Sequence, residues 1–576
     1  MTARETHPAM RLLFALSAVF CSLGALTSDA GKEEPAPAPV PAPAPAPAAP
    51  ASGMPVLPTP GTQATPEGAP SGAERKVPEI VRAQQERDRQ REAQIKQAID
   101  DQRARPDDPE PVGRLVDLYM EAHDGPKAVA AAEAFVKSHP DSAVGLWQHG
   151  RALYYTGDFL RADLLLSRAA TAAPGDARIQ SWVARSRSLL GDPEGSIKAA
   201  EAALAVDPES GQGLVSKARA LETLGRWAEA GKAWELVVAA KYKAGDQETR
   251  LLARSQMMAA LSHRLLYKAT WPEGAAPSAT IPMRTFRGMP AIRVRLNDHV
   301  DRYLLVDFST EDSIVTQDTA QALGLQGFGG APKRPDVDVY PAPDFAILDS
   351  IHAGGFAVQG IPVAINTQLK YPHPDVGGLL GRSFFVRFLA TLDYPGLTLT
   401  LAPPAAQPIE GVPAYYGGAT LVPARASGGD AGPFVLDTSN STPGPVSIIF
   451  AEKRLGLNVM SQGVRPILNG PYTFSFTMND LMVGNVIWKQ FRATGVDLRS
   501  LSERIGVEIS GVLGNQQLAD TRITADFAHS RVRLDRAREQ IWKSPSKLQE
   551  PPQPAAPAAQ APATATGAAA QAPDTP

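Results

Sequence analysis

Two aspartates occupy equivalent places in a pattern that the chain repeats. Asp307 and Asp437 each end an apolar segment, and each precedes a glycine-bounded apolar segment, at residues 378–381 and 511–514 respectively. If the two carboxylates meet, their mutual repulsion keeps one protonated while the other is ionised. Such a pair can act as an acid and a base in one reaction. The pattern therefore raises the hypothesis that Asp307 and Asp437 share a proton at one site.

Short alternating segments surround both aspartates and predict the sheet that positions them. Residues 291–296 and 531–534 alternate between apolar and polar side chains, and Gly, Pro, Asn and Asp provide turns between such segments. Period-two alternation at short spacing is typical of antiparallel β-structure. We therefore predict an all-β region made of two similar lobes, at residues 281–403 and 418–535.

The order of motifs in each half resembles that of a retropepsin-type aspartic protease domain. The matching motifs of the first half are Asp307-Phe308-Ser309, Ile314-Val315-Thr316, Gly378-Leu379-Leu380-Gly381 and Leu392-Asp393-Tyr394. Those of the second half are Asp437-Thr438-Ser439, Leu455-Gly456-Leu457, Gly511-Val512-Leu513-Gly514 and Asp526-Phe527. Two halves in one chain are also similar to the bilobal pepsin-type enzymes. The resemblance implies a bilobal all-β domain of the double-ψ barrel type, with Asp307 and Asp437 as the catalytic dyad.

The resemblance also implies roles for the residues around the dyad. Each glycine-bounded segment is expected to pack under its aspartate loop. Residues 331–345 and 465–476 would form hairpins over the cleft, with Tyr340 and Tyr472 as candidates there. Asp393 and Asp526 are expected to be structural, at the start of a closing turn.

The chain departs from the family motif Asp-Thr/Ser-Gly in both halves. Phe308 and Ser309 follow the first aspartate, whereas Thr438 and Ser439 follow the second. Thr438 retains the hydroxyl that binds across the lobe interface in this family, and Phe308 is expected to fill the interface with its ring. The family has glycine at the third position of the motif, and this glycine leaves room beside the carboxylates. Ser309 and Ser439 add a Cβ at that position. We assign Thr438, Ser309 and Ser439 to loop support.

Two functions follow from this departure. The first is a degenerate protease-like domain that binds an extended peptide without cutting it, within a scaffold of the cell envelope. The alternative is an active aspartic endopeptidase that hydrolyses peptide bonds with Asp307 and Asp437.

A helical repeat precedes the β region. From residue 109 to about 244, small and apolar residues recur with a period of 34 residues, and three of the four units end in proline. One unit has Leu146, Gly150, Leu153, Gly157, Ala162, Leu166, Ala169 and Pro174. The pattern resembles the tetratricopeptide repeat, which implies an all-α solenoid over residues 109–270, closed by an amphipathic capping helix. Its concave groove is expected to bind a protein or peptide partner; the alternative is a brace for the following domain.

The two ends of the chain differ in composition from the middle. Residues 12–26 are apolar and precede small residues, which predicts a signal peptide at 1–30 and export to the periplasm or cell envelope. Cys21, the single cysteine, is the candidate for a lipid anchor, and the alternative is a cysteine removed with the signal. Residues 31–77 and 545–576 are rich in Ala and Pro and are expected to be disordered. Residues 78–108 form a charged segment that is predicted to be helical.

Composition narrows the number of domains and the classes of ligand that the chain could bind. The chain has 576 residues, enough for two or three domains, and a net charge of -3, which gives no overall positive field for nucleic acid. The nine histidines form no His-x-x-x-His pair and no Cys/His cluster, so no metal site is indicated and no cofactor is expected.

Overall fold

The computed structural model describes residues 79–240, 246–273, 277–330, 344–371, 373–442, 444–457, 465–466 and 472–536. The predicted signal peptide, Cys21, the Ala/Pro-rich segments 31–77 and 545–576, and Tyr340 lie outside these residues. Tyr472 begins a strand, but its side chain is also outside them. Among the described helices, none combines the length and the apolar character that a membrane crossing requires.

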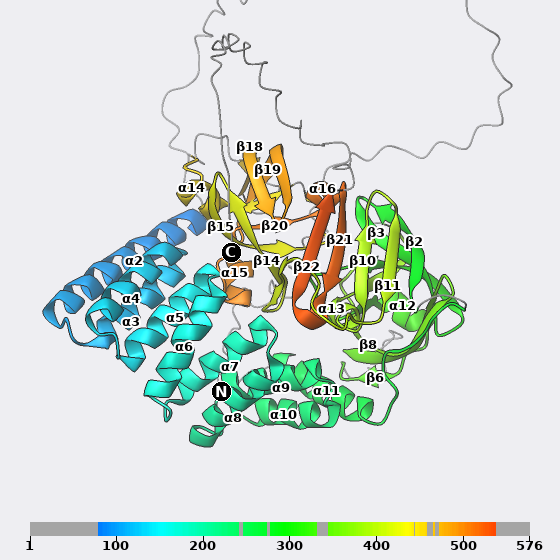
Figure 1. Ribbon diagram of the computed structural model, residues 1–576, viewed down its shortest axis with the longest axis horizontal. Coiled ribbons are helices and arrows are strands. Elements are labelled where there is room, and N and C mark those ends of the chain that lie inside the picture. The colour runs from blue at the N-terminus through cyan, green and yellow to red at the C-terminus, as the bar shows by residue number, and fades with distance from the viewer. Residues whose placement is uncertain are drawn as a thin grey trace, which may run out of the picture.

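The first part of the described chain is a stack of helices joined by short turns. Its helices are α2 Glu79–Ala104, α3 Pro109–Glu121, α4 Gly125–Ser138, α5 Ala143–Thr156, α6 Phe159–Ala172, α7 Ala177–Leu190, α8 Pro193–Val206, α9 Gly211–Thr223, α10 Trp227–Ala239 and α11 Asp246–Leu261. Asp158 shows how the sequence sets a boundary, since its carboxylate accepts from Arg161 N and starts α6. Gly157 ends α5 at φ 94°, where a side chain would be strained. The helices follow one another in an arc along one side of the β region (Figure 1).

The second part is β-rich and consists of two lobes with a similar element order. Lobe 1 contains β1 Lys268–Thr270, β2 Ala279–Phe286, β3 Met289–Leu296, β4 Val300–Val306, β5 Ile314–Thr316, α12 Gln317–Ala322, β6 Gly327–Phe328, β7 Phe345–Ala353, β8 Phe356–Asn366, β9 Val376–Leu380, α13 Arg382–Phe385, β10 Leu389–Asp393 and β11 Thr398–Ala402. Lobe 2 contains β12 Val412–Pro413, β13 Tyr415–Tyr416, β14 Thr420–Ala426, β15 Gly429–Leu436, β16 Pro445–Ser447, α14 Ile448–Lys453, β17 Arg465–Pro466, β18 Tyr472–Val483, β19 Val486–Val496, α15 Arg499–Ile505, β20 Gly511–Leu513, α16 Asn515–Leu518, β21 Thr521–Asp526, the 3₁₀ turn Phe527–His529 and β22 Arg531–Arg536.

Strand pairing repeats between the lobes. β4 runs parallel to β9 in lobe 1, with Val306 opposite Leu380, and β15 runs parallel to β20 in lobe 2, with Leu436 opposite Leu513. The pairs β5–β8 and β16–β19 are parallel as well. Each aspartate therefore follows a strand whose parallel neighbour is the glycine-bounded segment of the same lobe.

One shared sheet joins the two lobes. β10 of lobe 1 pairs antiparallel with β21 of lobe 2, and Asp393 lies opposite Arg522 in this register. Their side chains form an ion pair at 2.7 Å. Asp526 is buried and lies 2.9 Å from His529 Nδ1. Both aspartates are thus structural, as expected from the sequence. In Figure 1, β21 and β22 stand between the β18–β19 pair and the β10–β11 pair.

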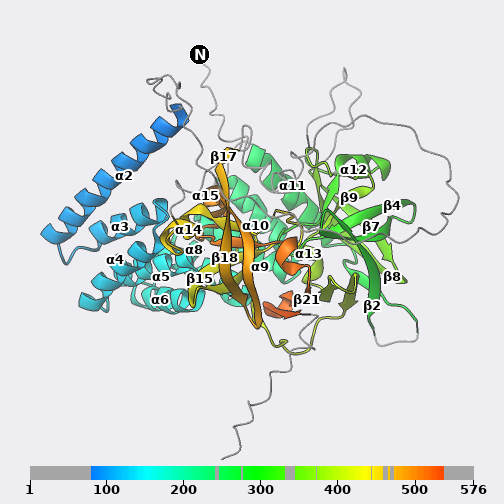
Figure 2. The same ribbon diagram turned by 90° about the horizontal axis from the view of Figure 1, so that it is seen from above.

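The helical arc packs directly on the β region. Trp234 and Met257 share an apolar cluster with Phe345 of β7, and Tyr154 and Phe159 share one with strands β14 and β15. This packing agrees with the alternative in which the helical repeat braces the β region. The helices and the two lobes lie against each other in both views (Figures 1 and 2).

Polar contacts accompany this packing along the whole arc. Arg185 on α7 donates to Ile505 O at 3.0 Å, and Glu508 N donates to Tyr155 O at 2.8 Å. Lys453 on α14 donates to His123 O at 2.9 Å. The inner side of the arc is therefore engaged with lobe 2 through the chain's own residues.

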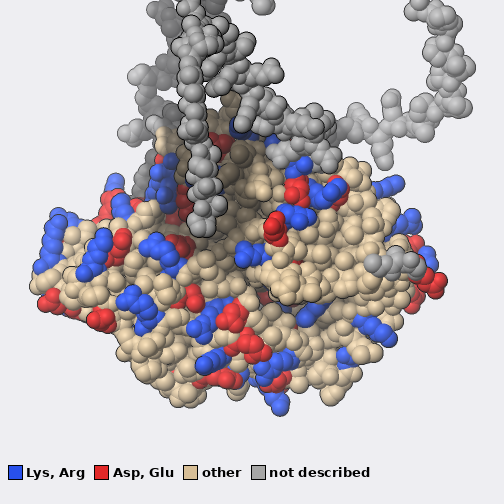
Figure 3. All heavy atoms as spheres, in the orientation of Figure 1, with Lys and Arg blue, Asp and Glu red and all other residues tan. Residues whose placement is uncertain are grey.

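Charges of both signs mix on the surface of the arc. On the face shown in Figure 3, Lys and Arg side chains alternate with Asp and Glu side chains across the described helices. This mixture agrees with the small net charge of the chain, -3. A surface of mixed sign on this face does not present the continuous positive field that attracts nucleic acid.

Candidate functional site

The two aspartate loops leave their strands in the same way. Asp307 N donates to Leu380 O, and Asp437 N donates to Leu513 O, each at 3.0 Å. These bonds tie each loop to the glycine-bounded strand beside it, which confirms that the two segments support the aspartate loops. The shared sheet then brings the two loop tips together at the lobe interface.

The two carboxylates lie at one site, where a single hydroxyl is within hydrogen-bond distance of both. Ser439 Oγ lies 3.1 Å from Asp307 Oδ2 and 2.9 Å from Asp437 Oδ1. A hydroxyl has one proton, so it donates to one carboxylate at a time and accepts from the other when that carboxyl is protonated. The third residue of the second loop, where the family motif has glycine, thus contacts both aspartates.

Asp307 receives more hydrogen-bond donors than Asp437. Ser309 N and Thr310 N donate to its Oδ1 at 2.7 and 3.1 Å, and Thr310 Oγ1 donates to its Oδ2 at 2.6 Å. Asp437 Oδ1 accepts from Ser439 N at 3.0 Å, besides the bridging hydroxyl. Donors to a carboxylate stabilise its charged form, and Asp307 has more of these donors than Asp437.

The pKa of Asp437 is raised from 3.8 to about 7. The largest cause is burial, which disfavours the charged form, and the second is the negative charge of Asp307. Hydrogen bonds from Ser439 and Asn440 act in the opposite direction and lower the pKa. Near neutral pH the pair can therefore hold one proton, and Asp437 carries it.

Thr438 locks the two loops to each other. Its Oγ1 accepts from Phe308 N at 3.0 Å and donates to Val306 O at 2.7 Å, so one hydroxyl binds the first loop twice. Thr438 is fully buried. These two hydrogen bonds fix the two aspartate loops relative to each other.

Phe308 fills the interface where the first loop lacks a threonine. Its ring is fully buried and lies edge-on to Phe385 and Phe527, with ring centroids 5.0 and 5.4 Å away. Thr420 on β14 donates its hydroxyl proton to Phe308 O. The expectation that the phenylalanine ring fills this interface is confirmed, and the Thr420 hydroxyl of lobe 2 adds a further cross-lobe bond.

Sequence reasoning did not single out three contributors to this site. Thr310 donates to Asp307, Tyr394 OH donates to Asn515 Oδ1 at 2.8 Å, and the Tyr394 side chain is buried beneath the pair. Burial raises the pKa of Tyr394, and the charges of Asp437 and Asp307 raise it further. Thr310 could have been found from its position three residues after Asp307, and Tyr394 belongs to the matching motif Leu392-Asp393-Tyr394, but neither this motif nor the position of Asn515 indicates a contact with the aspartate loops.

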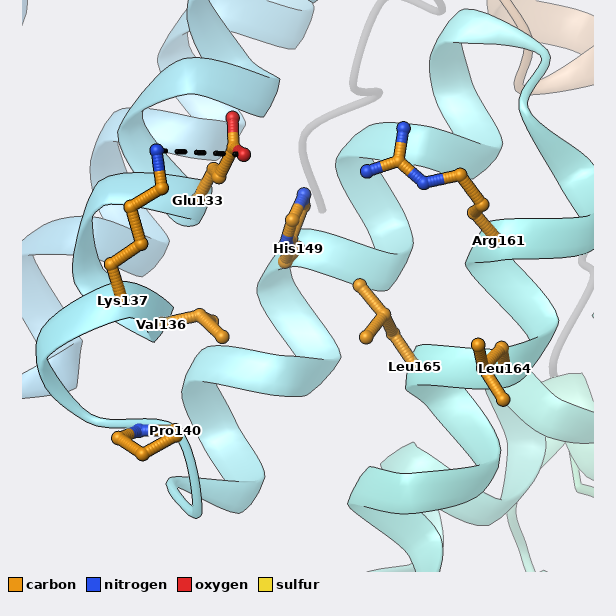
Figure 4. A pocket seen from close by; sticks show the side chains of 8 residues that line it. All are labelled: Glu133, Val136, Lys137, Pro140, His149, Arg161, Leu164 and Leu165. Atoms are coloured by element: carbon orange, nitrogen blue, oxygen red, sulfur yellow. Dashed lines mark ion pairs between the residues drawn. The ribbon is translucent and has the colours of Figure 1, made fainter.

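A separate cavity lies in the helical arc. It has a volume of about 320 Å³ and is bounded by α4, α5 and α6, with Leu164, Leu165 and Val136 on its walls (Figure 4). His149 is buried beside it, and burial lowers the pKa of this histidine. The cavity has no residue in common with the aspartate pair. Among the residues that the structure describes, no cluster of three or more His, Cys, Asp or Glu could hold a metal ion.

A sequence profile of the tetratricopeptide repeat matches residues 114–177 and 184–246. Tetratricopeptide repeats therefore make up this part of the helical arc. A comparison with curated proteins finds no match to the chain.

Solved structures that match the tetratricopeptide region share low sequence identity with it. The crystal structure of MamA is 21% identical, over 26% of this chain and 86% of its own, with a TM-score of 0.23. TTC0263, a thermophilic TPR protein of Thermus thermophilus, is 18% identical over 31% of this chain and 96% of its own, with a TM-score of 0.25. YrrB, described as a TPR protein with an unusual peptide-binding site, is 12% identical over 29% of this chain and 83% of its own, with a TM-score of 0.25.

Proposed function

We propose that the β region is an aspartic-protease-like domain that hydrolyses peptide bonds with Asp307 and Asp437. The observation that carries this proposal is the position of Ser439 Oγ, which lies within hydrogen-bond distance of both carboxylates. Carboxyl groups this close can share one proton, the state in which such a pair serves as acid and base.

Each aspartate has a distinct role in the proposed reaction. Asp307, which accepts four hydrogen bonds, is the base and removes a proton from water as the water oxygen bonds to the peptide carbonyl carbon. Asp437, whose pKa is about 7, donates its proton to the carbonyl oxygen. The tetrahedral intermediate then collapses: the C–N bond breaks, the proton taken up by Asp307 passes to the leaving amine, and one hydroxyl proton of the intermediate returns to Asp437 as the carbonyl re-forms.

The substrate class that suits two sheet-based lobes is an extended polypeptide. A strand-like peptide can form main-chain hydrogen bonds with exposed strand edges while its side chains enter alternate pockets. The pairs β6–β7 and β17–β18 form matching hairpin bases in the two lobes. We propose that an extended segment lies between these bases, across the aspartate pair.

A second candidate is peptide binding without hydrolysis, and Ser439 is the observation that favours it. Its hydroxyl fills the position between the carboxylates from which an attacking water would have to be activated. The domain would then bind a polypeptide as part of a scaffold. Tetratricopeptide repeats generally bind protein or peptide partners, and the outer side of the arc is the side available for this purpose.

Export to the cell envelope forms part of the proposal and rests on the apolar segment at residues 12–26 and on Cys21. Cell fractionation tests it. Recovery of the full-length protein from the cytoplasm alone would exclude export.

Substitutions of three residues separate hydrolysis from binding. Wild type, Asp307→Asn, Asp437→Asn and Ser439→Gly would be incubated with unfolded casein between about pH 3 and pH 7. Cleavage by the wild type and its loss in both Asn variants would support the dyad. Cleavage only after Ser439→Gly would show that the hydroxyl blocks the attacking water and would support binding as the native function. No cleavage by any form would exclude the hydrolytic proposal.

A further inference from the structure

The loop that carries Asp307 continues into an acidic pair that faces the tetratricopeptide solenoid. Glu311 and Asp312 lie four and five residues after Asp307. The matching positions of the second loop, after Asp437, are Ser441 and Thr442. The two loops therefore differ in charge, and the acidic one is the one that contacts the helices.

Arg254 on α11 forms ion pairs with both members of this acidic pair, and the charge of Glu311 also raises the pKa of Arg219 on α9. Its Nη1 lies 2.9 Å from Asp312 Oδ2, and its Nη2 lies 4.0 Å from Glu311 Oε1. Glu222 on α9 holds the same guanidinium through Nε at 2.8 Å and Nη2 at 2.6 Å. The side chains of Arg254 and Glu222 are each only 12% exposed, so solvent screens this cluster less than a surface ion pair.

The acidic pair is connected to the Asp307 carboxylate by a short chain of contacts. Thr310, the residue before Glu311, donates its hydroxyl proton to Asp307 Oδ2 at 2.6 Å. The backbone is tied down at the same point, since Arg382 N donates to Thr310 O and Ser383 N donates to Glu311 O, each at 2.8 Å. A shift of residues 310–312 would therefore move the Thr310 hydroxyl away from Asp307.

The helix that carries Arg254 has a second contact with lobe 1. Arg250, one turn earlier on α11, lies over the ring of Phe345 at 4.6 Å. Met257 and Met258 on the same helix belong to the apolar cluster that contains Phe345 and Ile347 of β7. These contacts fix α11 relative to lobe 1 independently of the ion cluster, so Arg254 is presented to the loop from a firmly packed helix.

We infer that Arg254 is a positioning residue for the aspartate pair, through which the last helices of the solenoid hold the Asp307 loop in the geometry that brings the two carboxylates together. Only the expected change in kcat rests on the proposed hydrolysis. The position of the Asp307 loop relative to Asp437 can be measured without substrate turnover. The solenoid is then part of the site and not a separate module. Displacing a catalytic group by about 1 Å can lower a rate on the order of 100-fold.

The test compares Arg254→Met with a matched control in the full-length protein. Arg254→Met retains a long apolar side chain and removes the charge. The control is Arg226→Met on the solenoid, which breaks the exposed ion pair of Arg226 with Glu229 at 2.6 Å. We expect Arg254→Met to lower kcat for casein-derived peptides at least about ten-fold with KM changed less than about two-fold, and Arg226→Met to leave both unchanged.

A titration provides a readout that does not depend on turnover. Protein labelled with ¹³C at the aspartate carboxyl carbons would be titrated by NMR, with the Asp437 signal assigned by its absence from Asp437→Asn. If the loop shifts in Arg254→Met, the charge of Asp307 moves away and the pKa of Asp437 falls from about 7 toward its ordinary value. Asp312→Asn, which removes one carboxylate, replaces Arg254→Met if that variant does not fold.

The two readouts separate the inference from the proposed function. An unchanged Asp437 titration together with an unchanged kcat would overturn the inference. If the wild type does not cleave, the proposed hydrolysis fails and the titration alone decides the inference: a lower pKa of Asp437 in Arg254→Met supports it, and an unchanged pKa overturns it.

Discussion

Replacing Asp437 with asparagine should remove a pH dependence from the folding stability. The pKa of Asp437 is about 7 in the folded protein, above its ordinary value of 3.8. Below pH 3.8 the carboxyl is protonated in both the folded and unfolded states, and its contribution to stability is fully present. As the pH rises toward 7 the unfolded state loses the proton first, so the free energy of unfolding decreases, and the loss is complete once the pH passes the folded pKa.

The structure sets the size of this effect. Each unit of pKa difference is worth about 1.4 kcal/mol, so a rise from 3.8 to about 7 corresponds to at most about 4 kcal/mol. Asp437 is only partly buried, and solvent reduces the full value. Asp437→Asn has no proton to lose, and its free energy of unfolding should lack this contribution.

Urea unfolding of wild type and Asp437→Asn at pH 4, 5, 6, 7 and 8 measures the difference. Taking the difference between the two proteins cancels other groups that titrate in this range, among them Glu508, whose pKa burial raises to about 7. The stability of the wild type relative to the variant should fall steadily between pH 4 and pH 7 and then level off. Asp307→Asn is a useful second variant, because removing its charge should move this decline to lower pH. A constant difference between wild type and Asp437→Asn from pH 4 to pH 8 would refute the assignment of the shared proton to Asp437.

Three further outcomes follow from the same geometry. Thr438→Val should lower the free energy of unfolding by about 2–4 kcal/mol in urea titrations, because Phe308 N and Val306 O lose their buried partner; Thr438→Ser, which keeps the hydroxyl, should lose less. Phe308→Ala should lower the free energy of unfolding by about 3–5 kcal/mol in the same measurement, because it empties a fully buried site between the lobes. A decrease below about 1 kcal/mol would show that the lobe interface closes over the emptied site. Glu508→Gln should stabilise the protein at pH 8 by at most about 3 kcal/mol and have little effect at pH 4, because the raised pKa of Glu508 makes its ionisation costly in the folded state; thermal unfolding at the two pH values checks this.

The pairing of the aspartates was predictable because it rests on a local pattern that occurs twice. An apolar segment ending in Asp307 and one ending in Asp437 each become a buried strand beside a glycine-bounded parallel partner. Buried strands read as continuous apolar runs, and a glycine permits the close approach of a neighbouring backbone; a Cβ at Gly381 would collide with the carbonyl oxygen of Asp312. The tetratricopeptide period was similarly visible, since small residues recur wherever two helices pack closely.

The docking of the solenoid on the β region was not predictable in the same way. Arg254, Glu222 and Asp312 come from three separate elements, and none of them has a sequence neighbour that marks it as an interface residue. Ion pairs between distant segments depend on the final packing and leave no periodic signal. The sequence left open whether the repeats bind a partner in their groove or brace the following domain, and the contacts of α5, α7 and α11 with the chain's own lobes agree with the brace.

The third residue of each aspartate loop shows what comparison with the family motif could not reveal. A serine in place of glycine was expected to add a Cβ beside the carboxylates and to support the loop. Ser309 contributes its backbone N–H to Asp307, as any residue there could, whereas Ser439 adds a hydroxyl that contacts both carboxylates. The effect of the substitution depends on which atoms the added group reaches, and only the assembled lobes determine this.

The fourth residue of each loop then decides which aspartate carries the proton. Thr310 donates both its backbone N–H and its hydroxyl proton to Asp307, whereas Asn440, at the matching place, acts on Asp437 through its side chain alone and accepts from Thr442 N at 2.8 Å. The first carboxylate therefore gains one donor more than the second at this position, and the second remains the easier one to protonate. Exchanging these two residues, as Thr310→Asn with Asn440→Thr, should lower the pKa of Asp437 in the carboxyl titration. An unchanged Asp437 titration in the exchanged protein would show that burial alone, and not the loop donors, divides the roles of the two aspartates.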